Sequence, residues 1–158
     1  MKRRFRHPTP EVLGALRRSP YFREMPAQKL EEMSRFFRED FFPGGSLLLE
    51  EKRPARRLFL LLQGAVAVSI RRGGEELIVE VHRKKGDLIG WSALVPPKQY
   101  TATAKALEDS RVLSIAGKDL EDFFRRHPSC GWLFLKKLST LIATRLHRTR
   151  TFLAENLR

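Results

Sequence analysis

The chain has 158 residues, which is long enough for a single domain with its own hydrophobic core. Its 31 Lys and Arg residues against 18 Asp and Glu residues give a net charge of +13, which favours an anionic partner without identifying it. The single cysteine, Cys130, excludes an intrachain disulfide and a metal site built from cysteines of one chain, and no apolar run reaches the roughly 18 residues of a membrane span.

The first elements in chain order are predicted to be short helices within residues 9–38. The basic N-terminus is not followed by an apolar segment, so it does not indicate a signal peptide, and we expect a soluble, cytoplasmic protein with no membrane association. Thr9 before Pro10 is typical of an N-cap and the first residue of a helix, which should close before Ser19. A second helix should begin near Pro26. Its expected apolar face consists of Leu30, Met33, Phe36 and Phe37.

Between residues 40 and 116 the chain changes to short apolar segments separated by turn residues, which is typical of a β sandwich or barrel. The expected strands are 46–50, 58–62, 65–70, 76–82, 101–107 and 112–115. Gly73-Gly74 predicts the tip of a tight hairpin, because both residues can take a positive φ. In the following strand a period of two places Leu77, Val79 and Val81 on an apolar face, opposite His82.

The last part, residues 117–155, is predicted to be helical. A helix from Lys118 to Arg126 should end at His127-Pro128, and a long helix should run from about Ser129. The apolar stripe of the long helix is wider than one docking surface needs, so we expect a homodimer along it; the alternative is that the stripe packs on its own β domain. The expected interface residues are Leu135, Leu138, Ile142 and Leu146.

The stretch from Gly86 to Ala106, GDLIGWSALVPPKQYTATAKA, has the most suggestive chemistry. Residues 90–94 should form one helical turn, which Pro96-Pro97 stops. Small residues and free amides at such a turn let an anion such as phosphate approach the backbone, although a corner loop without a ligand is the alternative. The candidate pocket residues are Gly90, Trp91, Ser92, Ala93, Lys98, Tyr100 and Thr101.

The order of these elements resembles the cyclic-nucleotide-binding domain of the catabolite-activator (Crp/Fnr) family. The segment 59–66, FLLLQGAV, is similar to that family's strand, glycine turn and strand, and 125–128, RRHP, to its helix end before the dimer helix. The resemblance implies a mainly β fold with flanking helices over the single domain 1–158. Its centre would be an eight-stranded double-stranded β-helix, a jelly-roll-like β roll, with a long C-terminal helix.

The resemblance is weaker in the phosphate-binding cassette. In the family a Glu holds the ribose 2′-hydroxyl and an Arg pairs with the cyclic phosphate. Trp91 stands at the Glu position and Tyr100 at the Arg position, while Lys52 stands where a glycine is common. We therefore expect no cyclic AMP or cyclic GMP binding in the usual way. A small anionic or aromatic ligand in the β roll is an alternative, with Lys98 as a partial substitute for the missing guanidinium.

Catalysis is not expected, because the chemical groups that it needs are not brought together by the sequence. The four histidines, His7, His82, His127 and His147, fall on different elements and are expected at the surface or at helix ends. No histidine is spaced to act as a base for Cys130, and no metal site is predicted. No helix-turn-helix segment follows the long helix within the 158 residues, so sequence-specific DNA binding is not expected either.

Two functions of different classes stay open at this point. The first is a sensory or regulatory module in which a small-ligand pocket at 86–106 is coupled to the dimer helix. The second is a ligand-free interaction scaffold whose basic surface docks an acidic protein or a nucleic acid.

Overall fold

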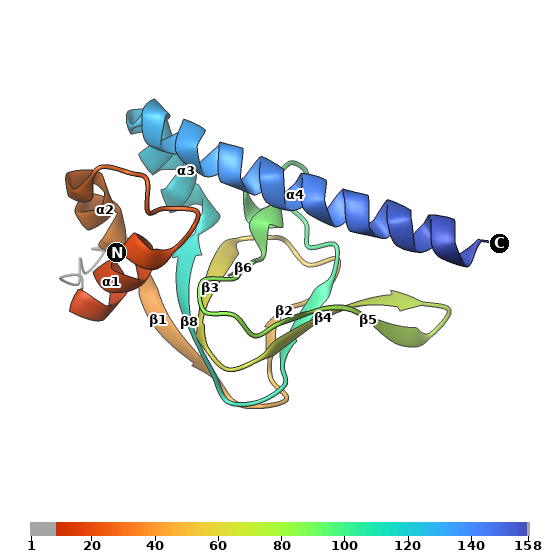
Figure 1. Ribbon diagram of the computed structural model, residues 1–158. Helices are drawn as coiled ribbons and strands as arrows, with labels where there is room; N and C mark the ends of the chain where they lie inside the picture. The colour runs from red at the N-terminus through yellow and green to blue at the C-terminus, as the bar shows by residue number, and fades with distance from the viewer. Residues whose placement is uncertain (1–8, 158) are drawn as a thin grey trace.

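The computed structural model describes residues 9–157, and its elements follow the predicted order. In Figure 1, the two N-terminal helices lie on one side of the strands, and the last helix crosses the molecule and extends beyond it. The elements are α1 (Pro10–Arg18), α2 (Ala27–Ser34), β1 (Arg38–Phe42), β2 (Leu47–Leu49), β3 (Arg57–Gln63), β4 (Val66–Arg72), β5 (Glu75–His82), β6 (Leu88–Ile89), the 3₁₀ turn η1 (Trp91–Leu94), β7 (Thr103–Ala106), β8 (Ser110–Ala116), α3 (Gly117–Arg126) and α4 (Pro128–Asn156).

The strands form two four-stranded antiparallel sheets, with the orders β1-β8-β3-β6 and β2-β7-β4-β5. β3 lies inside the first sheet between β8 and β6, and every residue from Leu58 to Leu62 is at most 7% exposed. A strand that is covered on both faces requires such a continuous apolar run. The predicted fold class, a β roll with flanking helices, is confirmed, although β1 and β6 were not resolved as separate strands by the sequence pattern.

The hairpin between β4 and β5 confirms one prediction and corrects another. Gly73 and Gly74 take φ values of +59° and +83°, which suit the predicted tight tip. The apolar face expected for β5 does not join the core, because Leu77, Val79 and Val81 are 47%, 57% and 41% exposed. The reason is that β5 is an edge strand and the hairpin projects past the roll beside the far half of α4 (Figure 1).

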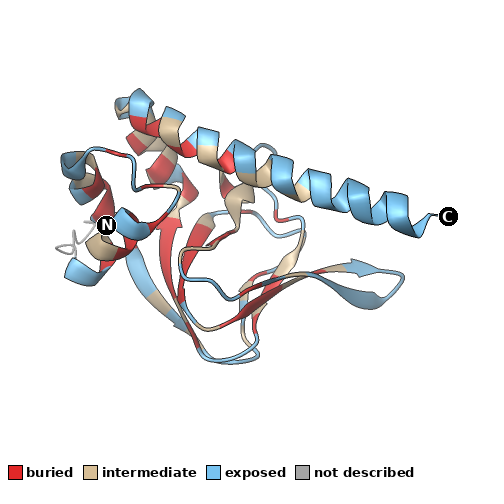
Figure 2. Cartoon of the chain, in the orientation of Figure 1, coloured by how far each residue is buried: buried red, intermediate tan, exposed pale blue. Residues whose placement is uncertain are grey.

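The helices close the core from one side. The Thr9 hydroxyl accepts a hydrogen bond from the Val12 amide at 3.3 Å, which confirms the predicted N-cap of α1. Phe134 of α4 is fully buried against Phe22, with their ring centroids 5.3 Å apart. α4 is buried only along its first half, and from Leu146 onward its residues are exposed (Figure 2).

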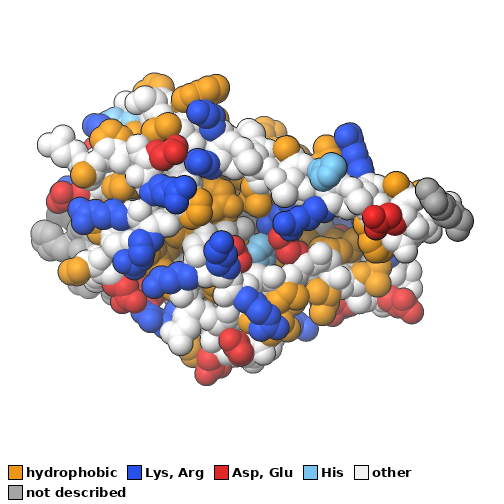
Figure 3. Space-filling model, in the orientation of Figure 1, with side chains coloured by type: hydrophobic (Ala, Val, Ile, Leu, Met, Phe, Trp, Pro, Cys, Tyr) orange, Lys and Arg blue, Asp and Glu red, His pale blue; other side chains and the backbone are white. Residues whose placement is uncertain are grey.

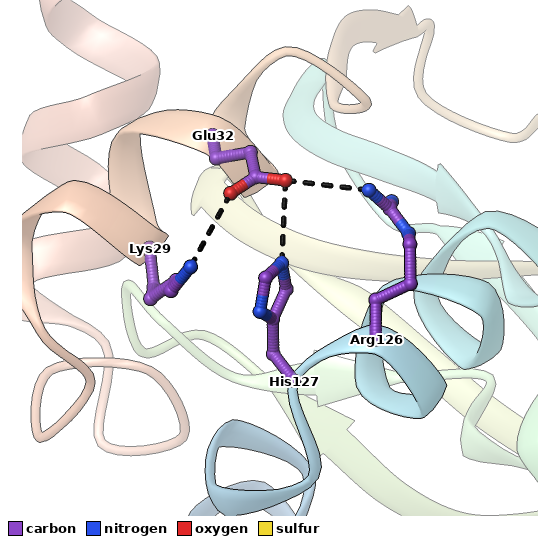
Figure 4. A network of polar contacts seen from close by, with 4 residues as sticks. All are labelled: Lys29, Glu32, Arg126 and His127. Carbon is purple, nitrogen blue, oxygen red and sulfur yellow. Dashed lines mark hydrogen bonds and ion pairs between the residues drawn. The ribbon is translucent and has the colours of Figure 1, made fainter.

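One polar network joins α2 to the junction between α3 and α4 (Figure 4). Glu32 Oε1 lies 3.3 Å from both His127 Nε2 and Arg126 Nη1, and Glu32 Oε2 lies 3.8 Å from Lys29 Nζ. Partial burial acts to raise the pKa of the Glu32 carboxyl, but the hydrogen bond and charge of His127, with both cations, bring it below its ordinary value. The network therefore stabilises the helix junction most strongly when Glu32 is ionised.

We expect the network to contribute to stability at neutral pH and to be lost in acid. A carboxyl whose pKa is lowered by folding stabilises the fold fully above its unfolded value of about 4.5, and the contribution disappears as the pH falls through the folded value. Glu32→Gln should therefore flatten the acid side of the stability curve measured by urea unfolding from about pH 7 to about pH 3. The matched control is Glu31→Gln, an exposed neighbour on α2; equal slopes for both variants and the parent would contradict this role.

Leu60→Ala should lower the free energy of unfolding by about 2 to 5 kcal/mol, because Leu60 is 1% exposed and the substitution leaves a cavity in the hydrophobic core. Leu77→Ala, on the exposed edge strand, is the matched control and should change stability by about 0.5 kcal/mol or less. Urea denaturation measures both. Similar values for the two variants would show that β3 is not the core strand.

Candidate functional site

The cassette stretch forms a corner between β6 and β7. Residues 91–94 form the predicted helical turn, and Gly90 before it takes a φ of +82°. A Cβ atom at Gly90 would lie 3.0 Å from the Arg57 carbonyl oxygen and 3.1 Å from Leu49 Cδ2, both tighter than ordinary contacts. Glycine is thus required there both by the backbone conformation and by the close approach of β3.

Below this corner lies a cavity of about 80 Å³ inside the β roll. It is bounded by the cassette, by inward-facing strand residues and by one residue of α4. Its lining residues are Leu49, Val68, His82, Leu88, Ile89, Gly90, Trp91, Ser92, Tyr100, Thr101, Ala102, Ala104 and Arg145. The cassette and the roll interior therefore share one pocket, and five of the seven candidate pocket residues line it.

Tyr100 closes one end of the cavity. Its hydroxyl donates a hydrogen bond to the Arg57 carbonyl oxygen at 2.7 Å and accepts one from the Arg57 amide at 3.2 Å. Burial raises the pKa of the Tyr100 hydroxyl, and the bonds to the Arg57 backbone only partly offset this, so the group is neutral at physiological pH. Tyr100 is anchored to β3 and offers the cavity an aromatic wall in place of a charge.

Two candidate pocket residues point elsewhere. The Lys98 ammonium lies 2.7 Å from a carboxylate oxygen of Glu121, because the acidic residue of α3 is next to the cassette, and Lys98 does not line the cavity. Ala93 is 1% exposed and packs against Gly117, where an added Cβ would lie only 2.7 Å from the Ala93 carbonyl oxygen. The expectations that Lys98 replaces the missing guanidinium and that Ala93 faces a ligand are corrected accordingly.

The cation that does reach the cavity is Arg145, from α4. Its Nη2 atom lies 3.1 Å from Glu80 Oε2 on β5, and its side chain lines the cavity across from the cassette. Arg145 is not among the pocket residues predicted from the sequence. The signal was its spacing: Arg145 follows Phe134, Leu138 and Leu141 at four, three and four residues, so it continues the face of α4 that packs on the roll.

His82 is the second polar residue whose position in the structure differs from the prediction. It is 5% exposed, so the expectation of a surface histidine is wrong. His82 is the last residue of β5, and its side chain forms part of the cavity wall. Its ring nitrogens lie 3.6 Å from Glu80 and 3.4 Å from Asp87. Burial acts to raise the pKa of Asp87, but the hydrogen bond and charge of His82, with the Lys84 amide, lower it. Both carboxylates thus hold the cationic side of the cavity in place.

The other described histidines and Cys130 do not line the cavity. His127 lies at the α3–α4 junction and His147 is exposed on α4, as expected, while His7 lies outside the described residues. Burial raises the pKa of the Cys130 thiol, which disfavours its nucleophilic form. Within residues 9–157, no group of three His, Cys, Asp or Glu side chains is arranged to hold a metal ion.

α4 presents two adjacent faces with different environments. Leu138 is 3% exposed in the chain's own core, so its assignment to a dimer interface is wrong. Leu135 and Leu146 are 51% and 49% exposed, and Ile142 is half-buried. The bare face repeats at alternating spacings of three and four residues through Trp132, Leu135, Ser139, Ile142, Leu146, Thr149 and Leu153. This spacing is that of a coiled-coil seam.

None of the described helices, α4 included, has an apolar stretch long enough to cross a bilayer.

A sequence model of the family described as "Cyclic nucleotide-binding domain" matches residues 39–127, more than half of the chain. The chain belongs to the cyclic nucleotide-binding domain family. The match begins in β1 and ends at the α3–α4 junction, so it includes the whole roll and the cassette of this cyclic nucleotide-binding domain.

Individual relatives support the same assignment. The cyclic AMP receptor protein of Thermus thermophilus is 26% identical over 129 residues, which is 81% of this chain and 57% of that protein, so the chain spans little more than half of this relative. A candidate cyclic nucleotide-binding protein from Geobacter metallireducens superposes with a TM-score of 0.74 at 27% identity, over 85% of this chain and 97% of the other. The N-terminal domain of a transcriptional regulator from Streptomyces coelicolor gives 0.68 at 26%, over 88% and 94%.

Proposed function

We propose that this cyclic nucleotide-binding domain is a non-catalytic sensory or regulatory module, in which the occupancy of the cassette cavity is passed to a dimer helix. The observation that carries the proposal is that Arg145 of α4 and the cassette residues Trp91 and Tyr100 line the same cavity. A ligand that enters would touch both, so its binding energy can differ between two positions of α4. Such a difference is what allows a ligand to shift a conformational equilibrium.

The ligand that we propose is not cyclic AMP or cyclic GMP bound in the family's usual way. Trp91 and Tyr100 replace the two charged contacts of the cassette, and the Tyr100 hydroxyl is already bonded to the Arg57 backbone. The cavity of about 80 Å³ is also far below the roughly 300 Å³ at which ligand pockets usually begin. A cyclic nucleotide would have to displace both aromatic side chains without gaining a charged partner from the cassette.

The dimer is proposed from the bare face of α4. Its exposed leucines would lie in the seam, and the exposed cations Lys136, Arg148 and Arg150 would stay at the flanks, where their mutual repulsion is screened by solvent. Arg145 lies between the seam residues Ile142 and Leu146 in the sequence, so the seam would pass close to the residue of α4 that lines the cavity.

A second candidate function is the ligand-free interaction scaffold. Two observations favour it. The cavity is small and has aromatic side chains in its wall, and many Lys and Arg side chains lie on the face in Figure 3, with acidic side chains interspersed. The exposed basic turn of Arg83, Lys84 and Lys85 adds to this surface. Native mass spectrometry of the purified protein separates the candidates, because a co-purifying small molecule supports the sensor and would be absent from the scaffold.

We expect no binding of cyclic AMP or cyclic GMP tighter than high micromolar. Charge-assisted hydrogen bonds contribute about 1.5 to 3 kcal/mol each, so losing two weakens binding by roughly a hundredfold to more than ten-thousandfold. Isothermal titration calorimetry checks this. A Trp91→Glu, Tyr100→Arg double variant should gain affinity, and the control Phe41→Glu, Ile78→Arg, which changes two exposed strand residues, should not. Submicromolar binding to the unmodified protein would overturn the ligand part of the proposal.

Light scattering should show a dimer at micromolar concentration, and Leu146→Glu should shift the mass toward the monomer, because it places two carboxylates in the seam. Thr144→Glu introduces the same charge on the opposite, exposed side of α4 and is the matched control. Leu138 is unsuitable for this test, since its substitution would disturb the core. A monomeric parent protein, or equal masses for both variants, would refute the interface.

A further inference from the structure

The guanidinium of Arg145 is only partly used within the chain. Its Nη2 lies 3.1 Å from Glu80 Oε2 in an ion pair, but its Nε is buried and has no hydrogen-bond partner among residues 9–157. A buried donor without a partner costs free energy, more so when it belongs to a charged group. The structure therefore keeps an unsatisfied cationic donor at the wall of the candidate ligand cavity.

The free donor lies where a two-oxygen anion would engage it. The Nε and Nη2 atoms form one edge of the guanidinium fork, and that edge binds a carboxylate or phosphate through two parallel hydrogen bonds. Glu80 occupies only the Nη2 half of the edge. The Nε atom has almost no accessible surface in this arrangement, so a ligand oxygen reaches it only when the Arg145 side chain turns toward the cavity. A two-oxygen group can then take the whole edge if Glu80 moves aside.

The lining residues of the cavity include a polar group and an apolar group. Arg145 and the buried His82 form its polar side, and no carboxylate is part of its lining. Leu49, Val68 and Trp91 form the apolar wall, and Tyr100 closes the cassette end with a neutral group. A negative group is thus favoured beside α4, while an apolar body is favoured against the roll and the cassette.

We propose that this cavity binds a small organic anion, a carboxylate or a phosphate, with its negative group on the Nε and Nη2 edge of Arg145 and its body against Trp91. The inference rests on the proposed function and names its ligand class. Arg145 is the specificity-determining residue, and the anion competes with Glu80 for it. Ligand binding then exchanges a contact between α4 and β5 for a contact between α4 and the ligand.

The cavity volume limits the size of the first probe. About 80 Å³ admits an anion of the size of acetate or inorganic phosphate without moving Trp91, whereas a larger body requires that side chain to shift. Acetate and acetamide have nearly the same shape but differ in charge, so the pair isolates the contribution of the anion. Sodium chloride at equal ionic strength controls for screening.

The test is a proton–nitrogen NMR titration of the whole chain with acetate, acetamide and inorganic phosphate, which reads the Arg145 Nε–H and Trp91 indole signals directly. Acetate or phosphate should shift both signals in a saturable way, and acetamide and chloride should not. The more effective of the two anions identifies the head group. Arg145→Gln and Arg145→Lys should each weaken the binding by about tenfold or more, because both lose the fork, while the exposed Arg148→Gln should leave it unchanged.

Two results would overturn the inference. One is an Arg145 Nε–H signal in the parent protein that responds to acetate and phosphate no more than to chloride, a readout that needs no variant to fold. The other is anion binding that both Arg145 variants retain. If a co-purifying molecule, once identified, shifts the Trp91 signal and binds equally to the Arg145 variants, the sensor function stands and only the anion site falls. If no small molecule shifts either signal, both fall together.

Discussion

The burial of β3 inside the first sheet, between β8 and β6, is the constraint on which the rest of this structure depends. Leu58 to Leu62 have almost no exposed surface, so the strand cannot shift without opening the core. Arg57, at the start of the same strand, therefore presents its backbone at a fixed place, and the Tyr100 hydroxyl binds both its amide and its carbonyl. Through this contact a core strand determines how the cassette closes.

The position of Tyr100 in the cassette affects both the polarity and the size of the cavity. With a neutral Tyr100 at one end, the charged groups that line the cavity are Arg145 from α4 and, when protonated, His82 from β5. Their carboxylate partners, Glu80 and Asp87, come from β5 and from the turn before β6. α4 is thus tied to the cavity through an ion pair at the point where its own contact with the roll ends. Beyond that point α4 is exposed (Figure 2), and this exposed half belongs to the face on which the dimer is proposed.

Much of the fold follows from local patterns in the sequence. Helix ends could be predicted because Thr9 and Pro128 act on the backbone next to them, and the hairpin tip because Gly73 and Gly74 tolerate a positive φ. The buried strand could be predicted from its continuous apolar run. The short strands β1 and β6 were not predicted, since β6 has only two residues and β1 consists of three charged residues followed by two phenylalanines, without alternation.

The sequence by itself determined the order of the elements, the continuous apolar core strand and the aromatic residues Trp91 and Tyr100 in the cassette, because these depend on residues that are neighbours in the chain. Only the tertiary structure decided which side chains meet in the cavity. Arg145 and Tyr100 are far apart in sequence, Lys98 could turn either to the cavity or to α3, and Leu138 and Leu146 lie on one apolar stripe. The positions of these side chains depend on long-range packing, which places a helix face or a strand end against a particular neighbour.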